Sequence, residues 1–129
     1  MRIEHVAMWT EDLDRLANFY KDYFGASVGE KYTNIARGFE SKFLSFESGA
    51  RLEIMRTTEF SPVRCDAGAQ RIGLTHLAFA IGSEQRVDEL TDRLRRDGYL
   101  ILDGPRRTGD GYYESVTLDP DGNRVEIAA

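Results

Sequence analysis

Cysteine is nearly absent from this chain, which has a single cysteine, Cys65, among 129 residues. One thiol cannot form an intrachain disulfide, and it cannot supply the several thiolates of a cysteine-rich zinc site. No apolar run approaches the roughly 18–20 residues that a membrane-spanning helix needs, and the opening residues lack the apolar core of a signal peptide. We therefore expect a cytoplasmic protein in a reducing environment, with no membrane partner.

Positive charge is in the minority. The chain has 17 Lys and Arg against 22 Asp and Glu, which gives a formal net charge of −5 and a pI of about 5.1. This charge repels a phosphate backbone at long range, so nucleic acid is not an expected partner. Hydrophobic residues make up 41% and charged residues 30% of the chain, which is typical of a globular protein. A length of 129 residues corresponds to one domain, or to two small halves that share a core.

Two segments carry apolar residues at helical spacing. The first begins after Thr10 or Asp12, either of which can cap a helix, and it ends at Gly25. The second begins at Ser83 and ends before Gly98, with three arginines in its last turn, where positive charge suits the helix dipole. The sequence therefore predicts two amphipathic helices, each terminated by glycine.

Eight runs rich in apolar and β-branched residues predict strands. One run precedes each helix and three follow it. The runs are residues 3–9, 27–32, 42–47 and 51–57 in the first half, and 74–81, 99–105, 112–119 and 124–128 in the second. The predicted order is therefore β-α-β-β-β, written twice.

Four landmarks of the first half recur in the second. They are the pairs His5 and His76, Gly25 and Gly98, Gly49 and Gly122, and Glu53 and Glu126. The histidines are 71 residues apart and the other three pairs 73, which requires a length difference of two residues near the start of the helix. We predict two tandem βαβββ modules, 1–57 and 74–129, which form one functional domain and are joined by an exposed linker, 58–73.

The two histidines of the chain and two of its glutamates thus hold matching positions. In each strand the ionisable residue has the parity opposite to that of the bulky aliphatic residues, so it lies on the other face of the sheet. A lone glutamate in such a strand is usually solvated, and a lone histidine is usually structural. The repeat favours a shared site instead, and pairing of the halves about a local two-fold axis brings His5, Glu53, His76 and Glu126 together.

Two imidazoles and two carboxylates form a borderline-to-hard ligand set. Such a set suits Ni, Zn, Fe, Mn or Co better than copper(I) or an iron–sulfur cluster. Four protein ligands, with water completing a higher coordination number, leave positions open for a substrate, so the metal acts as a Lewis acid.

Three further residues are candidates for substrate binding. Trp9 shares the parity of His5, so its ring lies either against a flat ligand or at a rim or dimer interface. Arg51 and Arg124 share the parity of the two glutamates and are candidates to bind an anionic substrate. Because both arginines lie beside turns, solvated surface charge is the alternative.

Several stretches together resemble a known superfamily. They are His5-Val6-Ala7, Phe19-Tyr20 with Phe24-Gly25, Leu52-Glu53-Ile54, Thr75-His76-Leu77-Ala78-Phe79, Asp119-Pro120-Asp121-Gly122-Asn123 and Val125-Glu126-Ile127. The chain resembles the vicinal oxygen chelate superfamily, which includes glyoxalase I, methylmalonyl-CoA epimerase, fosfomycin-resistance enzymes, extradiol dioxygenases and bleomycin-binding proteins. The resemblance implies an α+β fold in which paired βαβββ modules form a curled mixed β-sheet half-barrel, with the helices outside, around a divalent metal.

The resemblance also implies that His5, Glu53, His76 and Glu126 are the metal ligands. This pattern is closest to bacterial glyoxalase I. Epimerases typically have glutamine in place of Glu53, dioxygenases and fosfomycin enzymes use two histidines and one glutamate, and bleomycin-binding relatives lack a metal set. The arginine and asparagine with which glyoxalase I holds glutathione are not evident near Trp9 or Arg56. The superfamily further implies a homodimer.

The expected function is that of a divalent-metal-dependent lyase or isomerase similar to glyoxalase I. A small substrate with adjacent oxygens chelates the metal, which stabilises an enediolate, while Glu53 or Glu126 removes a proton and returns it to the neighbouring carbon. The alternatives are an epimerase, an Fe(II) extradiol-type dioxygenase, and a non-catalytic protein that binds a small molecule.

Overall fold

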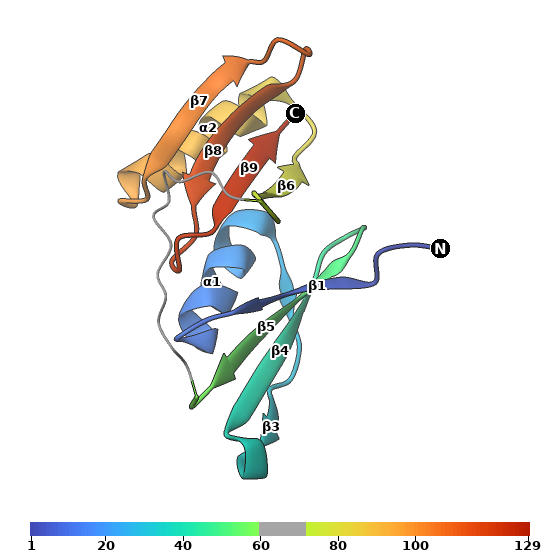
Figure 1. The fold of residues 1–129 in the computed structure, drawn as a ribbon. Helices are drawn as coiled ribbons and strands as arrows, with labels where there is room; N and C mark the ends of the chain where they lie inside the picture. The colour runs from blue at the N-terminus through green and yellow to red at the C-terminus, as the bar shows by residue number, and fades with distance from the viewer. Residues whose placement is uncertain (60–71) are drawn as a thin grey trace. The chain divides into compact units, whose positions relative to one another are not determined.

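The computed structural model describes residues 1–59 and 72–129. These residues form two α-helices and nine strands arranged in two mixed sheets (Figure 1). The chain divides into two compact units, Met1–Val63 and Arg64–Ala129, and in each unit one helix packs on one sheet. The predicted α+β class is confirmed. Most of the predicted linker, with Cys65, lies outside the described residues, and its described residues Thr58, Glu59, Ile72 and Gly73 are exposed.

The first unit consists of one helix and a five-stranded sheet. Its elements are β1 (His5–Trp9), α1 (Leu13–Phe24), β2 (Ser27–Val28), β3 (Tyr32–Asn34), the 3-10 turn η1 (Ile35–Arg37), β4 (Phe39–Ser45) and β5 (Arg51–Thr57). The strand order is β1-β5-β4-β2, with β3 also paired to β4. β1 runs parallel to β5, and all other pairs are antiparallel.

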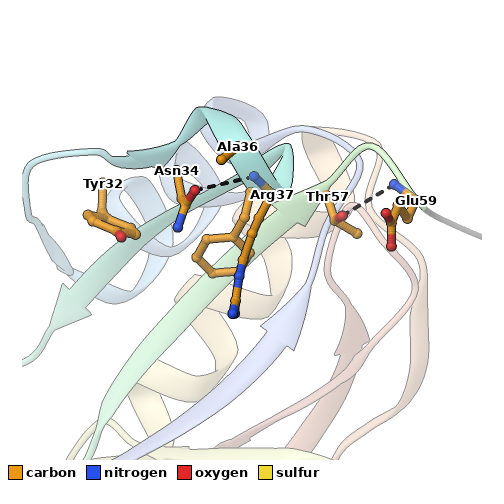
Figure 2. Close-up of a pocket in the computed structure, with 7 residues that line it drawn as sticks. Tyr32, Asn34, Ala36, Arg37, Thr57 and Glu59 are labelled. Atoms are coloured by element: carbon orange, nitrogen blue, oxygen red, sulfur yellow. Dashed lines mark hydrogen bonds between the residues drawn. The ribbon is translucent and has the colours of Figure 1, made fainter.

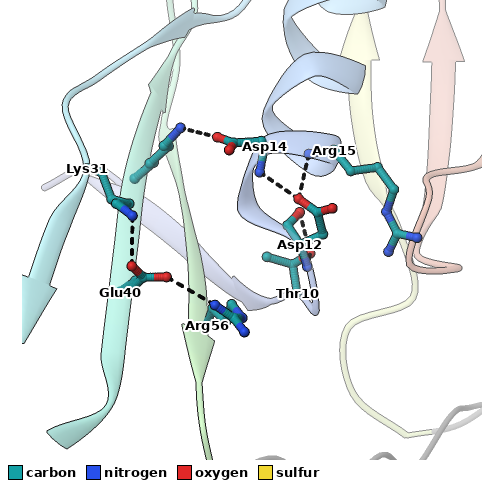
Figure 3. A network of polar contacts seen from close by, with 8 residues as sticks. Thr10, Asp12, Asp14, Arg15, Lys31, Glu40 and Arg56 are labelled. Carbon is teal, nitrogen blue, oxygen red and sulfur yellow. Dashed lines mark hydrogen bonds and ion pairs between the residues drawn. The ribbon is translucent and has the colours of Figure 1, made fainter. Parts of the chain in front are cut away.

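Helix α1 has both of the end signals that the sequence predicted. The side chain of Asp12 is the cap and accepts hydrogen bonds of 3.0 Å from the backbone N–H groups of Asp14 and Arg15 (Figure 3). The other candidate, Thr10, is buried, and its Oγ1 accepts from the backbone N–H of Asp12. Gly25 ends the helix with φ at 67°, a left-handed conformation that glycine adopts without strain.

The second unit repeats the plan with four strands. Its elements are β6 (Leu77–Ala80), α2 (Glu84–Arg96), β7 (Ile101–Arg107), β8 (Tyr113–Leu118) and β9 (Arg124–Ala128). The strand order is β6-β9-β8-β7, and β6 runs parallel to β9 just as β1 does to β5. Ser83 caps α2 as predicted, since its hydroxyl accepts from the backbone N–H of Arg86 at 3.3 Å.

The first unit departs from a strict βαβββ order. The run predicted as one strand, 27–32, is divided between β2 and β3, and η1 follows before β4 begins at Phe39. The division falls at Gly29, whose N–H donates to the carbonyl of Phe43 at 2.8 Å in place of a regular ladder. Asn34 caps η1, and Gly38 ends it with φ at 55°. The sequence interpretation ended the strand at residue 32 and predicted no element between residues 33 and 41, so it missed η1 and most of β3.

Several predicted strand boundaries were wrong by two or three residues. β6 begins at Leu77 instead of residue 74, β4 begins at Phe39 instead of residue 42, and β7 is displaced by two residues from 99–105. Strand ends are fixed by hydrogen bonds to a neighbouring strand, which composition alone does not locate. β5 and β9 match their predicted bounds.

The core of each unit lies between the helix and one face of its sheet. The largest fully buried apolar side chains are Leu16, Tyr20, Leu44 and Ile54 in the first unit, and Val87, Leu94, Val125 and Ile127 in the second. Each buried side chain of this size contributes roughly 1.5–3 kcal/mol. The opposite face of each sheet lies outside this core, so polar and ionisable side chains can occupy it. Neither helix in the described ranges is long and apolar enough to cross a membrane.

Candidate metal-binding pairs

In the first unit, His5 and Glu53 lie side by side on the face of the sheet that points away from α1. Parallel pairing of β1 with β5 places Ala7 opposite Glu53 and His5 opposite Arg51. The Nε2 atom of His5 is 3.7 Å from a carboxylate oxygen of Glu53. The predicted alternation is confirmed, because Leu52 and the other neighbour of Glu53, Ile54, are buried on the helix side.

The second unit has the same arrangement. His76 immediately precedes β6, and its Nε2 atom is 3.4 Å from a carboxylate oxygen of Glu126 on β9. Val125 and Ile127, which flank Glu126, are fully buried beneath α2. The structure thus brings together His5 with Glu53 and His76 with Glu126, each histidine with the glutamate of its own unit.

The geometry of each pair fits a shared metal ion. Two ligand atoms that each lie about 2.0–2.2 Å from a divalent ion are at most about 4.4 Å apart, and both N–O distances are shorter than that limit. The side chains of both glutamates are 18% exposed, so their oxygens remain accessible to an incoming ion. Over the parts of the chain that are described, no cluster of three or more His, Cys, Asp or Glu residues forms a metal site. Each pair therefore offers one nitrogen and one oxygen.

The imidazole of His5 is oriented by a neighbour that the sequence interpretation overlooked. Its Nδ1 atom is hydrogen-bonded to Glu4, and the Nε and Nη2 atoms of Arg51 donate to the other oxygen of Glu4, with Nε at 2.8 Å. Phe43 completes the group, with its ring edge-on to the imidazole at 5.5 Å and 4.1 Å from the guanidinium carbon of Arg51. The hydrogen bonds from His5 and from Arg51 lower the pKa of Glu4.

A second carboxyl group lies close to the His76–Glu126 pair in the second unit. Glu114 on β8 is diagonal to Glu126 on β9, because the direct partner of Glu126 is Val116. Burial raises the pKa of Glu114, and the negative charge of Glu126 raises it further. The sequence interpretation missed Glu114. Its alternation along β8 could have identified it, because Glu114 is two residues from Val116 and therefore lies on the same face of the sheet as Glu126.

The three candidate substrate-binding residues have different surroundings. Arg51 is engaged with Glu4 and Phe43, as described above. Arg124 is half-buried at the start of β9, opposite Leu118. Trp9 is 47% exposed at the end of β1, and its ring lies edge-on to Phe39 with centroids 6.1 Å apart.

A pocket of about 550 Å³ lies beyond this tryptophan in the first unit (Figure 2). Its lining comes from β3, η1, β4 and the end of β5, and consists of Tyr32, Asn34, Ala36, Arg37, Phe39, Thr57 and Glu59. The amide oxygen of Asn34 accepts from the backbone N–H of Arg37 at 3.2 Å, and the hydroxyl of Thr57 accepts from that of Glu59 at 3.2 Å. The sequence interpretation missed this pocket because it depends on β3 and η1.

The fold and the two His–Glu pairs agree with the family relationship of the sequence. Residues 2–127 match the Glyoxalase/Bleomycin resistance protein/Dioxygenase superfamily, and the chain belongs to that superfamily. It is 42% identical to the uncharacterised protein YqjT of Bacillus subtilis, over 98% of both chains. It is 28% identical to the metallothiol transferase FosB of Lysinibacillus sphaericus, over 97% of this chain and 79% of FosB.

Solved structures of glyoxalase proteins share the fold. Glyoxalase I from Zea mays superposes with a TM-score of 0.78 at 24% identity, over 98% of this chain. The match spans 44% of the maize enzyme, so this chain corresponds to less than half the length of that relative. At this identity the likeness establishes the fold, and the chemistry has to be argued from the residues.

Proposed function

We propose that this protein is a divalent-metal-dependent lyase or isomerase, similar to glyoxalase I, that acts on a small substrate with adjacent oxygens. One observation carries the proposal: each unit holds a histidine nitrogen and a glutamate oxygen at a spacing that one metal ion can bridge. Membership of a superfamily that includes glyoxalases supports it.

In this proposal the two pairs bind one ion, with His5, Glu53, His76 and Glu126 as ligands, in a homodimer. Nitrogen and carboxylate ligands in equal number suit Ni, Zn, Mn, Co or Fe. The second pair completes a set that neither unit holds by itself, because two protein ligands are too few for a stable site of this kind.

When bound, the metal supplies a Lewis acid that stabilises negative charge on the adjacent oxygens of the substrate. The chain's own residues move the proton. Glu53 or Glu126 accepts the proton from the carbon next to a carbonyl group and returns it to the neighbouring carbon. A carboxylate that held a dication would be a weak base, so the glutamate that moves the proton would be the one bound less tightly to the ion.

A second candidate is metal-dependent thiol transfer, which the 28% identity to a metallothiol transferase favours. The two reactions differ in a measurable way. Isomerisation exchanges a substrate C–H proton with the solvent and leaves the thiol count unchanged, whereas thiol transfer consumes one thiol for each turnover.

The test combines metal analysis with proton exchange. Protein purified without added metal or an affinity tag is expected to contain one of these ions, and in D₂O it is expected to introduce deuterium into hemithioacetals of 2-oxoaldehydes. Glu126→Gln should reduce the exchange by about 10²–10⁴-fold, the usual contribution of a general base. Glu40→Gln, which removes a surface carboxylate on the other face of β4, is the matched control. Metal-loaded protein that does not exchange protons in any such hemithioacetal contradicts the glyoxalase function.

A further inference from the structure

The pocket beside η1 combines an aromatic wall with a cation that no carboxylate of the described chain neutralises. Tyr32 and Phe39 form the wall, with ring centroids 6.3 Å apart. Arg37 extends its guanidinium between Tyr32 and Glu59 in the view of Figure 2. The backbone N–H of Arg37 donates a hydrogen bond to Asn34. Within residues 1–59 and 72–129, no side chain forms an ion pair with the guanidinium of Arg37.

This lack of a partner sets Arg37 apart from other cations nearby. Lys31 and Arg56 both bind Glu40, at 2.8 and 3.3 Å, and Lys42 binds Asp14 at 2.6 Å (Figure 3). With respect to residues 1–59 and 72–129, the guanidinium that lines the pocket therefore remains available to a ligand. A guanidinium is planar and binds a carboxylate or a phosphate group through two parallel hydrogen bonds, so Arg37 favours an oxyanion as the ligand.

Glu59 lines the same pocket and restricts the charge of the occupant. The carboxylate of Glu59 forms no ion pair with Arg37, although both residues line the cavity. The lining carries one positive and one negative charge, so a dianion such as a phosphate monoester gains no net electrostatic attraction to offset its larger desolvation cost, and a ligand with a single negative charge is favoured. The aromatic wall favours a flat, apolar body next to that charge.

The pocket continues the face that carries the first His–Glu pair. Thr57, in its lining, is four residues after Glu53 on β5 and shares its parity, at a separation of about 13 Å along the strand. Antiparallel pairing aligns Phe39 with Thr57 and Phe43 with Glu53, so these residues of β4 lie on the same face of the sheet, between the pocket and the His–Glu pair. Trp9 lies on the same face as His5, at the end of β1, and its ring contacts that of Phe39.

From this arrangement we infer that the pocket binds an aromatic monocarboxylate group, with the carboxylate on Arg37 and the ring on Tyr32 and Phe39. Resting on the proposed function, the inference also names the substrate class: a molecule whose adjacent oxygens reach the His–Glu pair and whose other end is this aromatic acid.

The test uses two probes and the metal-free protein. Phenylacetate is titrated into the ¹⁵N-labelled chain of residues 1–129 after treatment with EDTA, and phenyl phosphate is titrated in parallel. We expect saturable shifts at Tyr32, Arg37 and Thr57 with phenylacetate, and binding of phenyl phosphate at least 5-fold weaker. Arg37→Gln should weaken phenylacetate binding at least 10-fold, while Arg56→Gln, which removes an arginine bound to Glu40, should leave it unchanged. Glu59→Gln should reduce the difference in affinity between phenylacetate and phenyl phosphate.

Three results would overturn the inference. They are the absence of saturable shifts at these residues, equal binding by Arg37→Gln, and phenyl phosphate that binds as well as phenylacetate. Arg37 and Arg56 are exposed, so neither substitution disturbs the core. The amide spectrum of each variant checks that it keeps the fold. Because no metal is present, failure here leaves the metal measurements of the proposed function intact, and failure of those measurements leaves the binding of phenylacetate intact.

Discussion

The two histidines of the His–Glu pairs have different neighbours. His5 is preceded by Glu4, whose carboxylate binds Nδ1 and is itself held by Arg51, whereas His76 is preceded by Thr75. A carboxylate on Nδ1 fixes the tautomer and leaves Nε2 free to bind a metal. Nε2 is the atom of His5 that lies next to Glu53. We therefore propose that Glu4 positions the imidazole of His5.

Replacement of this carboxylate tests its role. Glu4→Gln is expected to lower the affinity of the protein for Ni²⁺ about 10-fold, the lower end of the range for the loss of such a partner. Isothermal titration measures the affinity, and the ¹⁵N shifts of His5 report its tautomer without metal. Thr75→Val, which alters the residue before the other histidine, is the matched control. An unchanged affinity together with an unchanged tautomer would show that Glu4 does not orient His5.

At the scale of elements, the end of η1 is held tightly against Thr58, the residue that follows β5. Gly38 has φ at 55°, and a Cβ atom added there would lie 2.2 Å from the hydroxyl of Thr58. The N–H of Thr58 also donates to the carbonyl of Gly38 at 3.0 Å. These contacts fix the wall of the pocket that carries Arg37.

Gly38→Ala is therefore expected to lower the free energy of unfolding by about 2–4 kcal/mol, since it combines left-handed strain with a steric clash. Gly49→Ala is the control, because Gly49 also has positive φ, at 88°, but a Cβ atom added there would meet no other atom within 4 Å. Gly49→Ala should lower the free energy of unfolding by the left-handed strain alone, about 1–2 kcal/mol. Urea denaturation measures both values, and equal losses would contradict the predicted clash.

The ion pairs across β4 have a predictable dependence on pH. Glu40 lies directly opposite Arg56, and the hydrogen bond from Lys31, followed by the one from Arg56, lowers the pKa of its carboxyl (Figure 3). A carboxyl whose pKa is lower in the folded state stabilises the fold above its unfolded pKa of about 4.5. That contribution is lost as the pH falls through the lowered folded value.

Glu40→Gln should consequently lower Tm at pH 7 by a few degrees at most, because the pair is at the surface. The difference between the two proteins should disappear as the pH falls below the usual glutamate range, and it should also shrink in high salt. Calorimetry across pH 3–7 measures it. A difference that is the same at pH 7 and pH 3 would mean that the charge of Glu40 does not contribute.

The elements that could be predicted from the sequence are those whose signals are local. Asp12 and Gly25 mark the ends of α1, and alternation of aliphatic residues located Glu53 and Glu126 on the polar face. The contacts that could not be predicted depend on neighbouring strands. Glu4 reaches Arg51 across the β1–β5 pair, and the pocket forms only where Tyr32 on β3 meets Phe39 on β4.

At the scale of the whole molecule, a tandem repeat has kept one His–Glu pair in each unit while the surroundings differ. The first unit adds Glu4, Arg51 and the pocket beside η1, and the second adds Glu114 beside Glu126. Such a division fits an enzyme in which both copies contribute metal ligands and one copy contributes the contacts that select the substrate.

The central claim is that both pairs hold the same ion. The most direct measurement is a titration of metal-free protein with Ni²⁺, in the native chain, in His5→Ala and in His76→Ala. The account predicts one ion per chain, with an affinity that falls at least 10-fold in either variant, although the two histidines belong to different units. Two independent ions per chain, or one histidine whose loss has no effect on the affinity, would contradict it.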